Sequence, residues 1–205
     1  MKKLLLIFLA LAFLAGCSSQ SSQPAQEKPQ PKPPEPVTGR YAFQKLYVTA
    51  HGWARDAQPY LLESQNMGDF KGQEGKAILW RAGFASPSEH SVKPYTWSGI
   101  DSPDAPTRGV NPGVEDTYSP NNSSTQIFDI AFLKIDSDKA LEVAQKHGGD
   151  KLMAKSADTP VLYLLDWNRA TNELTWHVIY GNSRDDAKLR VAVNASNGDF
   201  LRIEK

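Results

Sequence analysis

The chain has 205 residues, with 23 Lys and Arg against 23 Asp and Glu, and one cysteine. This balance gives no excess of basic residues that would indicate binding to nucleic acid or to anionic lipid. The part that has the composition of a folded protein, residues 38–205, is long enough for one medium domain or two small ones. All five tryptophans fall in that part, which indicates a packed interior.

The N-terminus has the pattern of a secretory signal. Two lysines at positions 2 and 3 precede the apolar run Leu4–Phe13. That run is shorter than the ~20 residues that a membrane-spanning helix needs. The segment that follows, Leu14-Ala15-Gly16-Cys17, resembles the lipobox of bacterial lipoproteins. The resemblance implies that residues 1–16 are removed and that Cys17 is then acylated. An ordinary cleaved signal with a chance cysteine is the alternative.

Lipid on Cys17 implies a protein that is anchored to the membrane without spanning it, because two or more acyl chains hold stably. Loss of the two leading lysines leaves 21 basic against 23 acidic residues, so the lipid is the expected attachment. Ser18 stands where an aspartate in Gram-negative lipoproteins specifies inner-membrane retention. The resemblance therefore implies a cell-envelope location on the periplasmic face of the outer membrane. With Cys17 acylated, no thiol remains for a disulfide or a metal.

Residues 17–37 are predicted to be the lipidated cysteine followed by a disordered linker. Ser18–Pro36 is rich in Pro, Gln and Ser and has no apolar periodicity. Such a stretch cannot bury enough apolar surface to order itself, and its Pro-rich half should be extended, at ~3.1 Å per residue. We expect it to hold the body away from the membrane. A Pro-rich docking ligand for a partner is the alternative.

Residues 38–135 are predicted to form a first α+β unit. The apolar spacing predicts a helix over Arg40–Arg55. A long loop is expected over Ile100–Ser124, because it contains four prolines and no periodicity. The predicted strands are Tyr60–Gln65, Lys76–Phe84, Lys93–Ser98 and Gln126–Ile135.

Residues 136–205 are predicted to form a second unit. Asp136, Ser137 or Asp138 can cap a helix over Lys139–His147 that stops at Gly148-Gly149. In two of the strands apolar and polar residues alternate, so they should be half-buried antiparallel strands. The predicted strands are Val161–Trp167, Glu173–Tyr180, Lys188–Ala195 and Phe200–Ile203.

The two units repeat one order of elements: a helix, a strand, a strand centred on a tryptophan, and a further strand. The fold class is therefore α+β, with antiparallel sheets each packed by one helix, in two tandem α-β-β-β units. A single α+β domain whose elements merely recur is the alternative.

The second unit resembles a PepSY-type domain. The strand Trp176-His177-Val178 and the closing hairpin Val193–Leu201 carry the resemblance, and Asn194 departs from it where an acidic residue is common. The resemblance implies a small, non-catalytic envelope module of a kind that binds or restrains peptidases. Extending it to the first unit, which matches less well, is an extrapolation.

No catalytic pattern stands out. The chain has no GxSxG, SxxK, HExxH, Walker or GxGxxG motif. His177 should lie on the strand face opposite the core tryptophan. The acidic pairs Asp136/Asp138, Glu115/Asp116 and Asp185/Asp186 are better explained as caps and turns than as a metal or catalytic site. We therefore expect no enzyme, no cofactor and no metal.

Three residues in or beside the long loop are candidate binding residues: Trp97, Arg108 and Tyr118. An aromatic, proline-fixed loop is a reasonable protein-contacting surface, although core packing is the expected alternative for Trp97. The predicted function is a membrane-anchored, non-catalytic envelope lipoprotein that binds or restrains a protein or peptide partner. The alternatives are an envelope assembly or scaffold lipoprotein, and a hydrolase that uses an acidic pair.

Overall fold

The computed structural model describes residues 32–204. The predicted signal peptide, Cys17 and most of the linker lie outside these residues. No helix in the described range is long and apolar enough to cross a membrane. The helical segments are α1 (Gly39–Trp53), η1 (Ser123–Thr125), η2 (Ile130–Phe132), α2 (Ser137–Ala144), η3 (Gln145–Gly149) and α3 (Asp150–Lys155). The strands are β1 (Val37–Thr38), β2 (Gln58–Gln65), β3 (Lys76–Ala77), β4 (Leu79–Ser86), β5 (Ser91–Ser98), β6 (Gly109–Pro112), β7 (Asp116–Thr117), β8 (Val161–Asn168), β9 (Glu173–Tyr180), β10 (Leu189–Asn194) and β11 (Phe200–Glu204).

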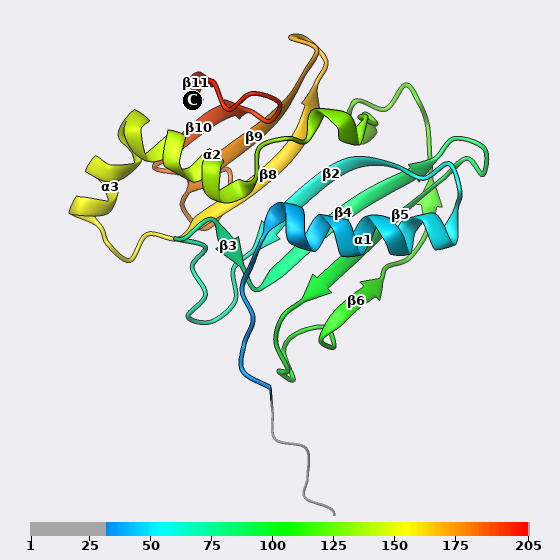
Figure 1. The fold of residues 1–205 in the computed structure, drawn as a ribbon, viewed down its shortest axis with the longest axis horizontal. Coiled ribbons are helices and arrows are strands. Elements are labelled where there is room, and N and C mark those ends of the chain that lie inside the picture. Colours follow the sequence, from blue (N-terminus) through cyan, green and yellow to red (C-terminus); the bar gives the residue numbers. More distant parts are fainter. Residues whose placement is uncertain (1–31, 205) are drawn as a thin grey trace, which may run out of the picture. The chain divides into compact units, whose positions relative to one another are not determined.

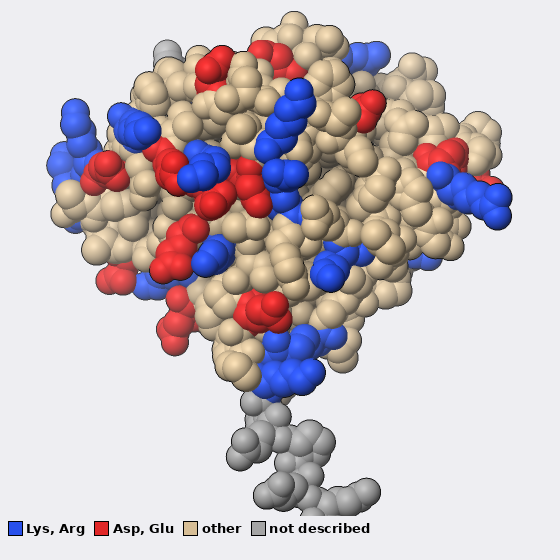
Figure 2. All heavy atoms as spheres, in the orientation of Figure 1, with Lys and Arg blue, Asp and Glu red and all other residues tan. Residues whose placement is uncertain are grey.

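One antiparallel sheet of nine strands forms the body, in the order β11-β10-β9-β8-β2-β4-β5-β6, with β7 also paired to β5. The short strands β1 and β3 form a separate ladder. Both α1 and α2 lie on the same face of the sheet, α1 over β4 and β5 and α2 over β9 and β10 (Figure 1). Acidic and basic residues are interspersed on this helix-covered face (Figure 2). The α+β class with antiparallel pairing is as predicted.

The strand order is symmetrical about its centre. Each half of the chain runs through a helix and then a meander, β2-β4-β5-β6 in the first half and β8-β9-β10-β11 in the second. The first strands of the two meanders, β2 and β8, pair antiparallel and join the halves. The predicted sheets are therefore one continuous sheet. We call the β2–β8 junction the seam.

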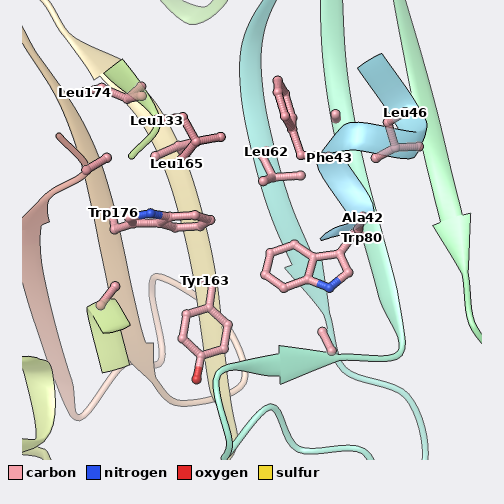
Figure 3. Close-up of a cluster of buried hydrophobic side chains, with 14 of the residues drawn as sticks. Ala42, Phe43, Leu46, Leu62, Trp80, Leu133, Tyr163, Leu165, Leu174 and Trp176 are labelled. Atoms are coloured by element: carbon pink, nitrogen blue, oxygen red, sulfur yellow. The ribbon is translucent and has the colours of Figure 1, made fainter. Parts of the chain in front are cut away.

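Two fully buried tryptophans hold the core on either side of the seam (Figure 3). Trp80 on β4 and Trp176 on β9 meet edge to face, with ring centroids 6.4 Å apart. Each indole Nε1 donates a hydrogen bond of 2.9 Å to a backbone carbonyl, Trp80 to Val37 and Trp176 to Ile135. Both acceptors lie two residues before the first residue of a helix. Each tryptophan thus fixes where the helix of its own half begins.

The two helices begin side by side at the seam. The Gly39 amide of α1 donates to Ser137 Oγ of α2 at 2.8 Å. Asp136 Oδ1 accepts from the Arg40 amide at 2.9 Å and from the Ser137 amide at 2.7 Å. The predicted cap of the second helix therefore caps both helices, where each N-terminus favours negative charge. A Cβ at Gly39 would lie 2.7 Å from Trp176, so only glycine fits there.

Replacing Asp136 with alanine is expected to destabilise the protein by about 2–3 kcal/mol, because one lost cap costs about 1 kcal/mol and this carboxylate caps two helices. Urea unfolding measures the loss. The matched control is Asp138→Ala, because Asp138 bonds only the adjacent Lys139 amide. Equal losses in the two variants would show that Asp136 caps one helix at most.

The prediction of a strand over Gln126–Ile135 is wrong. The segment forms the 3-10 turn η2 after η1, and Asp129 accepts a hydrogen bond from the Ala131 amide at 2.8 Å. Only Phe128 and Leu133 of this apolar run are buried, whereas Ile130 and Phe132 are exposed. The segment lies beside the start of β2, where the Phe128 amide donates to the Pro59 carbonyl at 2.8 Å, and β4 and β8 already occupy both edges of β2.

Two further predictions need correction, and one is incomplete. The loop over 100–124 contains β6 and β7, which pair with the edge of β5, where Pro112 is tolerated. The second helix is interrupted at the predicted stop, because His147 and Gly148 have non-helical backbone angles and Gly148 lies at φ 117°. A further short helix that was not predicted, α3, follows directly. The strands β9 and β10 are buried on both faces rather than on one. On the second face of β9, His177 is enclosed by Asp166 and Glu204.

Candidate functional site

The sheet face opposite the helices, here called the open face, carries a row of charged side chains. The register places alternate residues of neighbouring strands there, with Glu63 opposite Arg81 and His177 two strands away. From β4 to β11 the row consists of Arg81, Glu63, Asp166, His177, Glu204 and Arg202. The row contains both acidic and basic side chains, and several of them are paired with one another.

A pocket of about 410 Å³ opens on this face along the seam, here called the seam pocket. Both halves of the chain build it, because β2 and β8 form its floor. Its lining residues are Tyr60, Leu61, Glu63, Ser123, Ser124, Gln126, Leu164, Asp166, Trp167 and Arg184. A volume of this size lies within the range of ligand sites in proteins, about 300–1,000 Å³.

The wall of the seam pocket formed by residues 123–126 is held by a second small core. Tyr118 is buried against Ala85 and Val92, and Tyr60 packs on the same cluster. The Tyr118 amide also donates to the His90 carbonyl at 2.9 Å. Gly83 is required below Tyr60, because a Cβ there would overlap the phenol ring. The long segment predicted as a loop is thus packed on the sheet at this end.

Two carboxylates face the seam pocket from adjacent strands. Glu63 pairs with Arg81 at 3.2 Å, and Asp166 bonds His177 at 3.1 Å. Their side chains remain 29% and 33% exposed, so both can accept further hydrogen bonds from a bound group. Arg184 and Ser124 also line the pocket and can donate hydrogen bonds. The pocket therefore offers both acceptors and donors, as an extended peptide backbone or a polar side chain requires.

The imidazole of His177 is buried between two carboxylates. Its Nδ1 lies 2.8 Å from Glu204 Oε2 and its Nε2 lies 3.1 Å from Asp166 Oδ1. Burial opposes the charged ring, but the hydrogen bonds and charges of Asp166 and Glu204 outweigh it and raise the pKa of His177. Burial also opposes ionisation of Glu204, yet His177 and Arg202 lower the pKa of Glu204 to about 2. The cluster is thus an ion network.

This network has the composition of a catalytic site but not its geometry. A general base needs one ring nitrogen directed at a nucleophile or substrate, whereas both nitrogens of His177 are bonded to carboxylates. Among residues 32–204 no three His, Cys, Asp or Glu side chains are arranged to hold a metal ion. The other predicted acidic pairs are used locally, with Glu115 bonded to Lys93 at 2.8 Å.

The three predicted binding residues do not form one surface. Trp97 is buried on the helix side of the sheet, edge-on to Tyr41 at 6.3 Å between ring centroids. Tyr118 is buried on the open face, in the small core beside the seam pocket. Arg108 binds the chain itself. It donates to Asp101 at 2.9 Å and to the carbonyls of Lys32 and Pro33 at 3.0 and 2.9 Å. It fastens the end of the linker to the body.

Sequence patterns alone do not identify the seam-pocket carboxylates or the carboxylate partners of His177. Glu63, Asp166 and Glu204 occur as isolated charges in strands, and such residues normally face solvent. The one available signal was the placement of His177 opposite the core tryptophan, which is correct. A prediction of the strand register would have been needed to find its partners, which lie 11 and 27 residues away.

Comparison with known proteins defines the class. Residues 1–18 match the family model for the prokaryotic membrane lipoprotein lipid attachment site. The chain therefore carries the signal of a lipid-anchored lipoprotein of the bacterial cell envelope, as its N-terminus predicts. The match covers the N-terminus and leaves the body unassigned.

The body is similar to a solved structure. This is the crystal structure of a "putative lipoprotein" from Clostridium difficile 630, with a TM-score of 0.53 and 12% sequence identity over 80% of this chain and 91% of that chain. At this identity the likeness shows the fold alone. No curated protein matches the chain.

Proposed function

We propose that the protein is a lipid-anchored envelope protein whose body binds a protein or peptide partner without catalysing a reaction. The observation that carries the proposal is the seam pocket, which the two halves of the chain build together. Its floor is the junction of β2 and β8, so it exists only when both halves are joined.

The body is proposed to consist of two tandem PepSY-like units. The resemblance covers the second half, from the Trp176 strand to the closing hairpin. The first half supports the extension by its order of elements and by one matched detail, the indole bond of each tryptophan to a carbonyl two residues before a helix. Such modules are non-catalytic binders, and the doubled arrangement brings their first strands together at the pocket floor.

The chemistry of the pocket supports binding rather than turnover. The lining carries polar groups of both kinds, and the one buried histidine beside it has both ring nitrogens engaged. A partner segment can therefore be oriented by hydrogen bonds that Glu63 and Asp166 accept and that Arg184 donates. The linker would carry this surface towards partners in the envelope.

Crosslinking in intact cells tests the proposal. A photoreactive amino acid at Gln126, which lines the seam pocket, is expected to capture a specific envelope protein or peptide. The control position is Val48 on α1, which is 72% exposed on the other face of the sheet. Adducts at Gln126 that mass spectrometry cannot distinguish from those at Val48 would count decisively against a partner at the pocket.

Placement on the periplasmic face of the outer membrane is the second part of the proposal, and Ser18 is the residue that supports it. In a Gram-negative host, Ser18→Asp is expected to shift the protein to the inner-membrane fraction of a sucrose gradient. Ser18→Ala is the matched control and should leave the distribution unchanged. Inner-membrane location of the unaltered protein would contradict this placement.

A further inference from the structure

The last strand, β11, is the edge of the sheet, and its backbone pairs only with β10 (Figure 1). That pairing is irregular, since the register shifts between Ala192 and Val193. A second link bypasses β10 altogether. His177 on β9 reaches Glu204 on β11 over Ala192, the residue opposite His177 in the register. Alanine leaves the space that this side-chain contact needs.

The geometry of His177 sets its protonation state. A neutral imidazole has one N–H and one lone pair, so it can donate to only one acceptor. Both ring nitrogens here face carboxylate oxygens, those of Glu204 at 2.8 Å and Asp166 at 3.1 Å. Only the doubly protonated ring donates to both. After loss of one proton, a ring lone pair would face a carboxylate oxygen of Glu204 or Asp166 and repel it.

Other charged groups surround the ring from each neighbouring element. Arg202 on β11 holds the second oxygen of Glu204 at 2.8 Å. Arg190 on β10 lies two residues before Ala192 and therefore on the same face of the sheet. Glu63 lies across β8, and Arg184 lines pockets that include Asp166 and Glu204. Two carboxylates contact the ring directly, and no cation does so within residues 32–204.

We propose that His177, Asp166 and Glu204 form a pH-responsive clasp that holds β11 on the sheet. The clasp is closed while the ring carries two protons and loosens when it loses one. The clasp shares Asp166 with the seam pocket, but it does not require the partner proposed there. Folding raises the pKa of His177. The stabilisation of β11 by the clasp is therefore fully present below about pH 6.5, the usual pKa of histidine, and is lost as the pH rises through the pKa that His177 has in the folded protein.

Hydrogen exchange tests the clasp on the full-length lipidated protein in detergent. Exchange is followed by mass spectrometry from about pH 5.5 to about pH 9, which brackets histidine titration, and is corrected for the intrinsic rate at each pH. Protection of the β11 backbone is expected to fall about tenfold for each unit by which the folded pKa exceeds the unfolded one. Protection of α1 should not follow this titration.

Matched variants identify the group responsible. His177→Gln should make β11 protection independent of pH, and Glu204→Gln should move the transition to lower pH. The control is His147→Gln, because His147 stacks on Phe200 of β11 at 3.7 Å from the helix side. Constant protection in the unaltered protein, a transition that survives His177→Gln, or one abolished by His147→Gln would each overturn the proposal. Should His177→Gln not fold, the Glu204→Gln and His147→Gln pair decides the outcome.

Discussion

Once its signal segment is cleaved, a Cys17→Ala variant is expected to move from the membrane fraction to the soluble fraction almost completely. The reason is that no other attachment is evident. The chain loses its two N-terminal lysines with the signal and keeps 21 basic against 23 acidic residues. Residues 32–204 contain no helix that could cross a bilayer. Two or more acyl chains hold a protein stably, whereas surface charge of this kind contributes little.

The measurement is sedimentation of membranes followed by immunoblotting. A necessary control is the mass of the N-terminus, because an uncleaved signal segment would also hold the variant on the membrane. Processing of lipoproteins requires the cysteine, so cleavage of the variant must be shown rather than assumed. A cleaved Cys17→Ala protein that still sediments with membranes would show that another attachment exists.

Local patterns in the sequence predict most of the helices and strands. They fail where strand pairing between distant segments determines the structure. The helical spacing in Arg40–Arg55 matches α1, and the alternating runs match β9 and β10. The apolar run Gln126–Ile135 is as strand-like as either, yet no edge of β2 is free to pair with it. Which segment takes a place in a sheet depends on competition between distant segments, and one segment's pattern does not contain that information.

The candidate site illustrates the same limit. His177 could be assigned to its face of the strand, because alternate residues point to opposite faces. Its carboxylate partners could not be assigned, since Asp166 and Glu204 meet it only through the register of β8, β9 and β11. The seam pocket depends on the pairing of β2 with β8, residues about one hundred positions apart in the chain. The contacts of Arg108 with Asp101 and with the end of the linker were likewise outside what its local sequence could indicate.

Replacing Trp176 with alanine is expected to destabilise the body by about 3–5 kcal/mol, the usual cost of removing a fully buried aromatic side chain. The side chain is 0% exposed, and its loss also leaves the Ile135 carbonyl without its indole donor. Trp80→Ala is the matched variant in the other half, since it removes the equivalent ring and the bond to Val37. Urea unfolding followed by circular dichroism measures both losses. Trp53→Ala, on the partly exposed side of α1, should cost much less.

The shape of these transitions tests the division into residues 38–135 and 136–205. The sheet is continuous through the seam, the helix N-termini share Asp136, and Trp80 contacts Trp176. Interactions of this density across a junction make the halves unfold together. Either tryptophan variant should therefore lower one common transition, with the same midpoint for probes placed in each half. Two separated transitions, with only the mutated half shifted, would show that the halves are independently stable domains that merely share an edge.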